Sequence, residues 1–465
     1  MGGVPRFLSV KPDPNLISLP WQVPLAEWPS EHLVALPRGI SRHVVRFIRV
    51  GSDVYAAKEV IQHAAMHEYR LLHELARLGT PAVEPLAVVT GRTDVDGEPL
   101  DPVLLTRHLR FSLPYRSLFS MGVRPDTVTR LVDAMVVLLV RLHLIGFMWG
   151  DVSLSNVLFR RDAGEYAAYL VDAETGELHD KLTDGQRLHD LQIATVNLFG
   201  EFSDLEAGRI LVSGVQPREL VSLIETRYLS LWKELTGVEE FSGSELHRIE
   251  HRVRRLNSLG FDIAELDMRT APDGSTVRIQ PKVVEAGHHS RRLQRLTGLD
   301  VEENQARRLL NDLDTYRART GQQDVDEAVV AHQWLTVCFE PVVTAVPVEL
   351  AGKREPAQIF HEVLDYRWYA SQRENREVPL VEATQGYIAD VLASLPDEAQ
   401  TTDPAATVEG NRELLNPYDP SQGFADDEEE PPYDPWEAEA HAPDMERLPD
   451  HLDIDALRRR ASLGE

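Results

Sequence analysis

Asp151, Asn156 and Asp172 are polar residues whose types and spacing together suit one kind of chemistry. Asn156 follows Asp151 by five positions, and the chain from Asn156 to Asp172 has the pattern of two short strands joined by a turn at residues 162–165. Phosphoryl transfer needs a carboxylate that orients the attacking oxygen and oxygen ligands that hold Mg²⁺ against the phosphates. The sequence therefore predicts Asp151 as the catalytic carboxylate and Asn156 and Asp172 as metal ligands.

A simpler interpretation of this stretch is turn chemistry, because Asp, Ser and Asn all favour turns and an Asp–Asn pair at this spacing is common by chance. The preceding sequence argues against it. Residues 128–144 have the apolar periodicity of a helix, and Gly146 follows where such a helix would end. His143, Gly146 and Gly150 then lead directly to Asp151. The combined pattern favours a catalytic loop delivered by a helix.

A lysine suited to binding phosphate occurs on a predicted strand nearer the N-terminus. In residues 54–60 the two-residue period of a strand places Val54, Ala56 and Lys58 on one face. A solvated lysine is not expected to share a face with small apolar side chains. We interpret Lys58 as a phosphate-binding ammonium group and Ala56 as the floor of an adenine pocket, so both are predicted nucleotide-binding residues.

The lysine needs a carboxylate partner, and the next predicted helix, residues 61–78, supplies one in Glu68. Helical spacing places Glu68 beside the apolar face of that helix, which is made by Leu71, Leu72 and Leu75. Glu74 is the alternative, but it falls on the polar side. We therefore predict an ion pair between Lys58 and Glu68.

These residues together resemble the atypical bacterial kinases of the lipopolysaccharide-kinase and RIO type. The resemblance is carried by Ala56-x-Lys58, Glu68, Leu142-His143-x-x-Gly146, Gly150-Asp151-x-Ser153-x-x-Asn156 and Val171-Asp172. It implies a protein-kinase-like fold, ATP with Mg²⁺ (or Mn²⁺) as cofactors, and phosphate transfer to an acceptor hydroxyl, with Lys58 at the α- and β-phosphates. The later part of the chain resembles an uncharacterised domain (DUF4032-like) that accompanies such kinases in actinobacterial proteins.

The chain departs from that family pattern at three places. Trp149 stands where these kinases commonly carry histidine, and Glu174 stands two residues after the metal-binding carboxylate in place of glycine. There is no G-x-G-x-x-G; the expected nucleotide loop, residues 37–42, offers Gly39, Ser41 and backbone N–H groups to the phosphates. Two alternatives therefore stay open: an ATP-binding pseudokinase or nucleotide-sensing scaffold without phosphotransfer, and ATP hydrolysis that drives a conformational switch.

Two further segments are expected to support the site. Residues 102–107 read as a strand that enters a hinge at residues 108–110, whose backbone would bind adenine. A helix is predicted over residues 184–202. Its Asp190 either braces the catalytic loop through backbone N–H groups or is a solvated helix acid.

The predicted fold class is α+β: a two-lobed kinase-like fold with an antiparallel sheet and helix in the N-lobe and a helical C-lobe, then an α-rich domain and a tail. Helical periodicity in the α-rich domain covers residues 244–259, 304–316 and 356–368, and a hairpin is predicted over residues 261–284. The expected boundaries are an N-terminal extension at 1–29, the ATP-binding domain at 30–204, the accessory domain at 205–396 and an acidic tail at 397–465.

Charge and composition limit the partners. Of the net charge of −27, the tail contributes 20 acidic residues against 5 arginines, so we expect it to be disordered and a candidate binding segment for a protein partner. Residues 241–321 contain 14 Lys and Arg against 12 Asp and Glu, too small a surplus for a nucleic-acid binder. The chain shows no membrane-spanning run, no apolar signal-peptide core and a single cysteine, Cys338, which predicts a cytoplasmic enzyme. The expected partners are a nucleotide and an unidentified acceptor, either a small molecule or a protein.

Overall fold

The computed structural model describes residues 4–398, apart from residues 11–12, 37–42, 52, 121–123, 213, 238, 243–250, 252–255, 257–260 and 271–275. The predicted helix at 244–259 and the predicted tail from residue 399 onward lie outside the described residues, except for isolated positions in the helix. The chain forms two compact units. The first holds residues Met1–Glu225 with two later segments, Val348–Glu355 and the described residues from Leu392; the second holds Thr226–Pro347 and Pro356–Val391.

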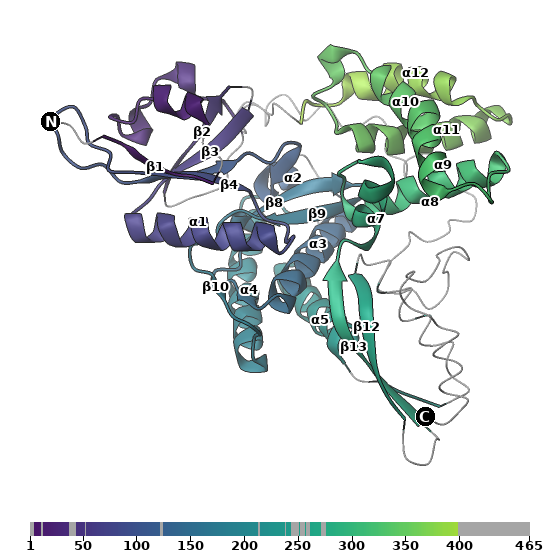
Figure 1. Cartoon of the computed structure of the whole chain (residues 1–465), viewed down its shortest axis with the longest axis horizontal. Coiled ribbons are helices and arrows are strands. Elements are labelled where there is room, and N and C mark those ends of the chain that lie inside the picture. The colour runs from purple at the N-terminus through teal and green to yellow at the C-terminus, as the bar shows by residue number, and fades with distance from the viewer. Residues whose placement is uncertain are drawn as a thin grey trace. The chain divides into compact units, whose positions relative to one another are not determined.

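The first unit begins with a five-stranded antiparallel sheet and one helix (Figure 1). The strand order is β1-β4-β5-β3-β2. The bounds are β1 Arg6–Leu8, β2 Val44–Val50, β3 Asp53–Glu59, α1 Gln62–Arg77, β4 Pro85–Thr90 and β5 Val103–Arg107. One face of the sheet packs on an N-terminal segment whose buried side chains include Trp21, Leu25 and Trp28. The other face packs on α1. The two faces of β3 are therefore covered by different parts of the chain.

The alternation predicted for the lysine strand follows from this arrangement. Tyr55 and Ala57 of β3 are buried in the core shared with the N-terminal segment. Ala56 and Lys58, one residue out of phase, therefore project from the opposite face. On α1 the buried face includes Ala65, Leu72 and Leu75, and Glu68 lies on that same face.

Helices and short strands make up the remainder of the first unit (Figure 1). The elements are β6 Ser112–Pro114, α2 Tyr115–Ser120, α3 Pro125–Leu144, β7 Phe147–Met148, β8 Val157–Asp162, β9 Glu165–Leu170, β10 Glu177–Leu178, α4 Asp184–Ala207 and α5 Pro217–Thr236, which continues into the second unit. The predicted hairpin is confirmed: β8 and β9 pair in register from Val157–Leu170 to Asp162–Glu165.

The end of α3 explains one of the glycines before the catalytic loop. Gly146 has a φ of +85°, and a Cβ at this position would lie 2.0 Å from the carbonyl oxygen of His179. Only glycine satisfies both conditions. The chain therefore leaves α3 abruptly, forms β7 against β10, and enters the loop that carries Asp151.

The two later segments of the first unit form ion pairs with β8 and with each other. Arg160 forms an ion pair with Glu355, and Arg161 pairs with Glu398 at 2.9 Å. Glu398 also contacts Arg354 at 3.0 Å, and all but a small part of both residues is buried. In the sequence these segments flank Pro356–Val391, the later part of the second unit, yet they belong to the first unit.

The second unit is mostly helical with one small sheet. Strands β11 Glu239–Ser242, β12 Phe261–Thr270 and β13 Thr276–Ala286 pair antiparallel in the order β11-β13-β12, which contains the predicted hairpin. The helices are α7 His288–Thr297, α8 Glu303–Arg319, α9 Glu327–Trp334, α10 Glu340–Thr344, α11 Pro356–Glu374 and α12 Leu380–Asp390, with a π-helical turn at Leu335–Phe339. The rings of Trp334, Phe339 and Phe360 pack together in its core. Among the described residues, no helix combines the length and apolarity needed to cross a membrane.

Candidate active site

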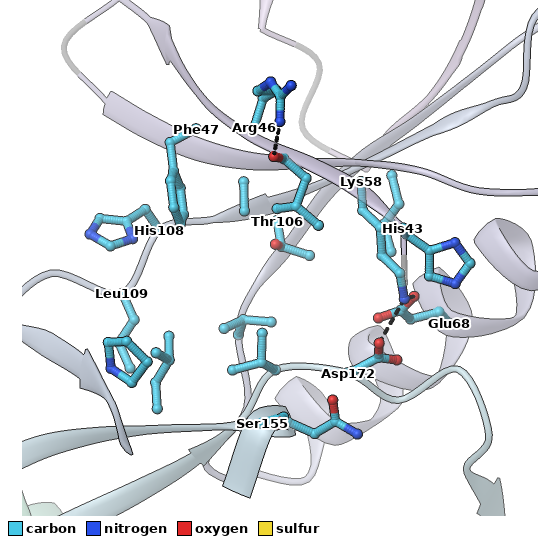
Figure 2. A pocket seen from close by; sticks show the side chains of 18 of the residues that line it. His43, Arg46, Phe47, Lys58, Glu68, Thr106, His108, Leu109, Ser155 and Asp172 are labelled. Carbon is cyan, nitrogen blue, oxygen red and sulfur yellow. Dashed lines mark hydrogen bonds and ion pairs between the residues drawn. The ribbon is translucent and has the colours of Figure 1, made fainter. Parts of the chain in front are cut away.

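A cavity of about 630 Å³ in the first unit contains most of the residues predicted to act on a nucleotide (Figure 2). This volume is in the range of small-molecule sites. Part of its wall is apolar and comes from the sheet, the hinge and the β8–β9 hairpin; this part includes Val45, Phe47, Ala56, Val83, Leu104, Leu158 and Val171. The other part is polar and includes Lys58, Glu68, Asp151, Asn156 and Asp172.

Sheet register places Ala56 and Lys58 within this wall. Ala56 lies opposite Phe47 on β2 and Thr106 on β5. Lys58 lies opposite Val45 and Leu104 on the same two strands. All of these residues line the cavity, so the two-residue period predicted from sequence is confirmed for the strand that carries the lysine.

Lys58 is held by three carboxylates. Its Nζ lies 3.0 Å from Glu68 Oε2 and 2.8 Å from Asp172 Oδ2 (Figure 2). It also lies 3.0 Å from Glu174 Oε2. The predicted ion pair with Glu68 is therefore present. The bonds to Asp172 and Glu174 were not predicted, because these residues lie more than a hundred positions away in the sequence.

Burial has opposite consequences for the two members of the predicted pair. Burial alone would lower the pKa of the Lys58 ammonium, but the carboxylates of Glu68 and Asp172 raise it by more than burial lowers it. The net pKa lies above its ordinary value, so the group stays charged. Burial and then the neighbouring Asp172 raise the pKa of Glu68 to about 7, although Lys58 opposes this. The shared ammonium therefore neutralises only part of the acidic charge around it.

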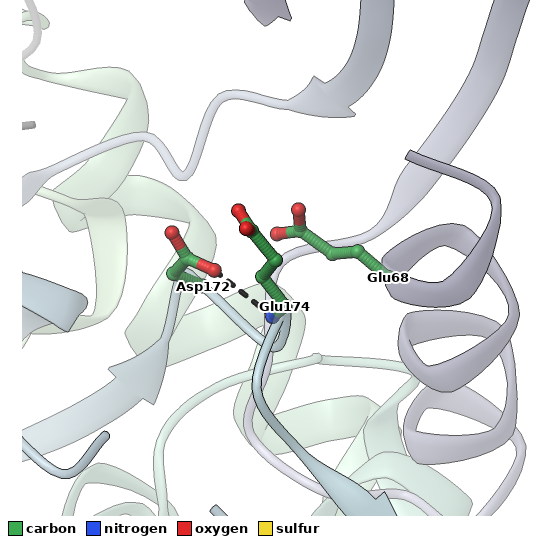
Figure 3. Close-up of side chains that lie close together, drawn as sticks. All are labelled: Glu68, Asp172 and Glu174. Atoms are coloured by element: carbon green, nitrogen blue, oxygen red, sulfur yellow. Dashed lines mark hydrogen bonds between the residues drawn. The ribbon is translucent and has the colours of Figure 1, made fainter. Parts of the chain in front are cut away.

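Glu68, Asp172 and Glu174 form a cluster of oxygen ligands whose atoms lie within 4.8 Å of one another (Figure 3). The backbone N–H of Glu174 donates to Asp172 Oδ1 at 3.0 Å, which fixes that carboxylate. His43 Nε2 lies 3.1 Å from Glu174 Oε2. Three acids facing one ammonium leave an excess of negative charge, and oxygen ligands are those that Mg²⁺ prefers. The donor set thus fits a divalent cation.

Asn156 and Asp151 are coupled directly. Asn156 Nδ2 donates to the backbone oxygen of Asp151 at 3.1 Å and to Asp151 Oδ2 at 3.2 Å. Both partners can only accept hydrogen bonds, so the amide nitrogen must face them. The amide oxygen of Asn156 is then directed away from Asp151, which suits the predicted role as a metal ligand.

Asp190 braces the loop that precedes Asp151. Its carboxylate accepts hydrogen bonds from the backbone N–H groups of Trp149 at 2.7 Å and Gly150 at 2.8 Å, and its side chain is fully buried. His143 Nε2 lies 3.0 Å from the same carboxylate. Burial holds the pKa of His143 below its ordinary value, although the nearby Asp190 carboxylate opposes this. A carboxylate can only accept, so Nε2 donates to it. Of the two interpretations of Asp190, the bracing one is confirmed.

Trp149, the first departure from the family pattern, connects the loop to the metal-binding side. Its indole N–H donates to the backbone oxygen of Asp172 at 3.2 Å, and its ring is fully buried. Thr175 Oγ1 in turn donates to the backbone oxygen of Trp149 at 2.9 Å. The tryptophan therefore contributes to the geometry of the site rather than only filling space.

The predicted hinge lines the cavity through His108 and Leu109 (Figure 2). The ring of His108 packs edge-on against Phe47, with centroids 5.3 Å apart. Burial and then Arg110 lower the pKa of His108 to about 4. Gly39 and Ser41, the predicted phosphate-loop residues, lie outside the described residues.

Sequence reasoning assigned no role to His43, Asn197 or Glu201, which contact Glu174, Asp151 and Ser155 respectively. Asn197 and Glu201 lie on one face of α4 at helical spacing, and this was a detectable signal. For His43, sequence offered no signal, because its partner comes from a distant loop.

Two family models match separate parts of the chain. Residues 44–196 match the model of the lipopolysaccharide kinase (Kdo/WaaP) family, and residues 230–392 match that of a domain of unknown function, DUF4032. The predicted resemblance to lipopolysaccharide kinases and to DUF4032 is confirmed. The fold is the kinase-like α+β fold, with an antiparallel sheet and helix followed by a helical part. Such a match indicates a kinase-type phosphotransferase that uses ATP and a divalent metal.

The kinase-family match contains the predicted catalytic residue, Asp151, and the predicted metal ligands, Asn156 and Asp172. It also contains Lys58 and ends before Asn197. Among solved structures, the chain is similar to one described as "WaaP in complex with acyl carrier protein". The identity is 18%, the TM-score is 0.30, and the alignment covers 49% of this chain and 99% of that one. No curated protein matches the chain.

Proposed function

We propose that this protein transfers the γ-phosphoryl group of ATP to the hydroxyl of an acceptor, in the presence of Mg²⁺ or Mn²⁺. The observation that carries the proposal is the convergence of Lys58, Asp151, Asn156 and Asp172 on one cavity that also has an apolar wall. An apolar wall beside fixed charges is what a nucleotide requires, since its base and its phosphates have opposite solvation preferences. The proposal includes a cytoplasmic location, where ATP is available.

The adenine ring would lie against Ala56, Leu104 and Leu158, with the backbone of the hinge at His108 and Leu109 at its edge. This placement directs the phosphates toward the polar half of the cavity. Lys58, which Glu68 anchors, would then neutralise charge on the α- and β-phosphates. Its present partners Asp172 and Glu174 would become available to a cation.

Asn156, through its amide oxygen, and Asp172, through its carboxylate, would hold the divalent metal, and Glu174 is a further ligand of the same kind. A metal bound there would offset the negative charge of the phosphates during transfer. The chain itself supplies the orientation: the backbone N–H of Glu174 fixes Asp172, and Asp151 fixes the Asn156 amide.

Asp151 would act on the acceptor. Its carboxylate would accept the hydroxyl proton as the acceptor oxygen forms a bond to the γ-phosphorus. The bond between the γ-phosphorus and the bridging oxygen breaks, and ADP leaves with that oxygen. Each step uses only the acceptor, ATP and Asp151, so no other reactant is needed.

A nucleotide-binding scaffold without transfer is the second candidate. The observation that favours it is Trp149, which stands where these kinases commonly carry histidine and whose indole binds the backbone oxygen of Asp172. A scaffold would bind ATP by the same residues, but its nucleotide would remain intact.

The deciding experiment uses γ-labelled ATP with purified protein and Mg²⁺ or Mn²⁺, beside Asp151→Ala and Asp172→Ala variants. Phosphotransfer predicts label on an acceptor or on the protein, whereas label as free phosphate indicates ATP hydrolysis; either is lost in Asp151→Ala while nucleotide binding persists. Asp172→Ala should lose metal-dependent nucleotide binding itself. Binding by the wild type with no transfer to any acceptor tried favours the scaffold, and absence of ATP binding contradicts both functions.

A further inference from the structure

Helix α4 contacts the catalytic loop at three places along one face. Asp190, Asn197 and Glu201 are seven and four residues apart, so an ideal helix places them within about 40° of one another around its axis. They span about 16 Å along that axis, and the loop from residue 149 to residue 155 can extend over a similar length. The three helix residues can therefore contact the start, the middle and the end of the loop in turn.

The hydrogen bonds follow this order. Asp190 binds Trp149 and Gly150 at the start of the loop, as described above. Asn197 Nδ2 donates to Asp151 Oδ1 at 3.2 Å and to the backbone oxygen of Val152 at 3.2 Å. The loop and the helix thus run in the same direction, and the second contact reaches the catalytic carboxylate itself.

Asn197 and Asn156 hold Asp151 from two sides. Asn197 donates to Oδ1 and Asn156 donates to Oδ2, so each carboxylate oxygen has one amide donor. One donor alone would leave the carboxylate plane able to rotate about its bond to Cβ, whereas donors to both oxygens restrict that rotation. The carboxylate is therefore oriented without a positive charge that would compete with the acceptor's proton.

Glu201 makes the third contact, at the end of the loop. Its Oε2 accepts from the backbone N–H of Leu154 at 2.6 Å, and its Oε1 accepts from the N–H of Ser155 at 2.9 Å and also from the Ser155 hydroxyl. These N–H groups begin the short 3-10 turn Leu154–Asn156, and such initial N–H groups have no partner within the turn. Glu201 supplies that partner and so fixes the turn that ends in Asn156.

We propose that Asn197 and Glu201 are positioning residues for phosphotransfer: Asn197 sets the orientation of the Asp151 carboxylate, and Glu201 sets the turn that presents Asn156 to the metal. This inference rests on the proposed function. Both side chains are only partly buried, and the packing of α4 comes from other positions, among them Leu191, Ala194, Leu198 and Phe202. Variants at 197 and 201 are therefore expected to fold.

The contact is tested first without any activity. Hydrogen exchange at the backbone amides of Leu154 and Ser155 is measured in the full chain, in Glu201→Gln and in Gln192→Ala, which changes an exposed residue of the same helix. A glutamine side chain keeps one acceptor oxygen and gains an amide nitrogen that cannot accept, so exchange should become about 10-fold faster or more at one of the two amides at least. Gln192→Ala should not change it. Unchanged exchange in Glu201→Gln overturns the inference whether or not the protein is a kinase.

The functional half is tested by separating turnover from binding. Asn197→Ala is expected to lower kcat for ATP by about 10- to 100-fold, the effect of a small misplacement of a reacting group, with KM for ATP within about 3-fold. Asn197→Asp, of the same size, should be at least as damaging, because a carboxylate cannot donate to Asp151. Glu201→Gln should weaken Mn²⁺ binding in the presence of ATP, measured by calorimetry, by about 5-fold.

Equal kcat in Asn197→Ala and Gln192→Ala contradicts the role of Asn197, and equal Mn²⁺ affinity in Glu201→Gln and Gln192→Ala contradicts that of Glu201. If the wild type binds no ATP, the proposed function fails and the roles in phosphotransfer fail with it. The exchange measurement still reports in that case whether Glu201 fixes the loop, so the two failures are distinguished.

Discussion

The indole N–H of Trp149 donates a 3.2 Å hydrogen bond to the backbone oxygen of Asp172. This bond links the loop that carries Asp151 to the strand end that carries the predicted metal ligand. Trp149 is also attached to α4, because its backbone N–H donates to Asp190. A residue that departs from the family pattern therefore joins the two halves of the site.

The first prediction concerns this bond. Trp149→Phe keeps a large buried ring and removes the donor, so it should cost about 1–3 kcal/mol of unfolding free energy and weaken Mn²⁺·ATP binding several-fold. Trp28→Phe is the matched control, because its buried indole donates to the backbone oxygen of Val23 at 3.0 Å, away from the cavity. Denaturant unfolding and calorimetry measure both. A similar loss of nucleotide affinity in the two variants would contradict a specific role for Trp149.

The second prediction concerns the acidic cluster. Lys58→Met should abolish ATP-dependent turnover and leave Glu68, Asp172 and Glu174 facing one another, at a cost of about 2 kcal/mol because Asp172 and Glu174 are partly exposed. Millimolar Mn²⁺ should then raise the Tm of the variant more than that of the wild type. Lys181→Met, at an exposed position, is the control. No additional Mn²⁺ effect in Lys58→Met would mean that the cluster does not bind a cation.

The third prediction concerns pH. The pKa of His108 is lowered from its ordinary value of 6.5 to about 4, so between these values the unfolded chain binds more protons at this residue than the folded chain. Its contribution to stability is present above pH 6.5 and is lost as the pH falls toward 4. His108→Gln should therefore lose less stability than the wild type between pH 7 and pH 4.5 in urea unfolding. His63→Gln, which removes an exposed histidine, should follow the wild type, and parallel curves for all three would refute the assignment.

The fourth prediction concerns the brace beneath the loop. Asp190 Oδ1 accepts from Gly150, and its Oδ2 accepts from Trp149 and His143, in a fully buried site. Asp190→Asn replaces one of these oxygens with an amide nitrogen, which cannot accept from the donors that face it. We expect a loss of about 3 kcal/mol in unfolding free energy, in the range measured when a buried pair is broken. Asp204→Asn, at an exposed position on the same helix, should change it by less than about 0.5 kcal/mol. Equal stability of the two variants would exclude a bracing role.

The fifth prediction concerns the end of the first unit. Leu392 and Leu395 are buried there, and Glu398 pairs with Arg161 and Arg354. A chain that ends after residue 398 should keep the Tm of the full chain, whereas one that ends after residue 390 should lose more than about 5 °C. Differential scanning calorimetry compares the two. If both truncations leave the Tm unchanged, the later segments do not stabilise the first unit.

Local sequence patterns were sufficient to predict the local chemistry. The period of a strand was enough to place Ala56 and Lys58 on one face, and the period of a helix was enough to place Glu68 beside the apolar side of α1. The hairpin between Asn156 and Asp172 followed from its turn and its two short strands. These features depend on neighbouring residues, and local periodicity carries that information.

Tertiary structure alone decided which distant groups meet. Lys58 shares its ammonium with Asp172 and Glu174, and Glu174 contacts His43, because β3, β2 and the strand end after β9 converge at one cavity. A local sequence pattern carries no information about which distant residues meet in space. The choice between a solvated and a bracing Asp190 also required the fold, since burial of a helix face depends on what packs against it.

The same reason explains the roles found for α4. Helical spacing groups Asp190, Asn197 and Glu201 on one face, but spacing cannot say what lies opposite. The structure places the catalytic loop there, parallel to the helix, and each side chain finds backbone or carboxylate partners in order. Residue types and spacing thus determined the candidate chemistry of this chain, and long-range packing decided which side chains hold that chemistry in position.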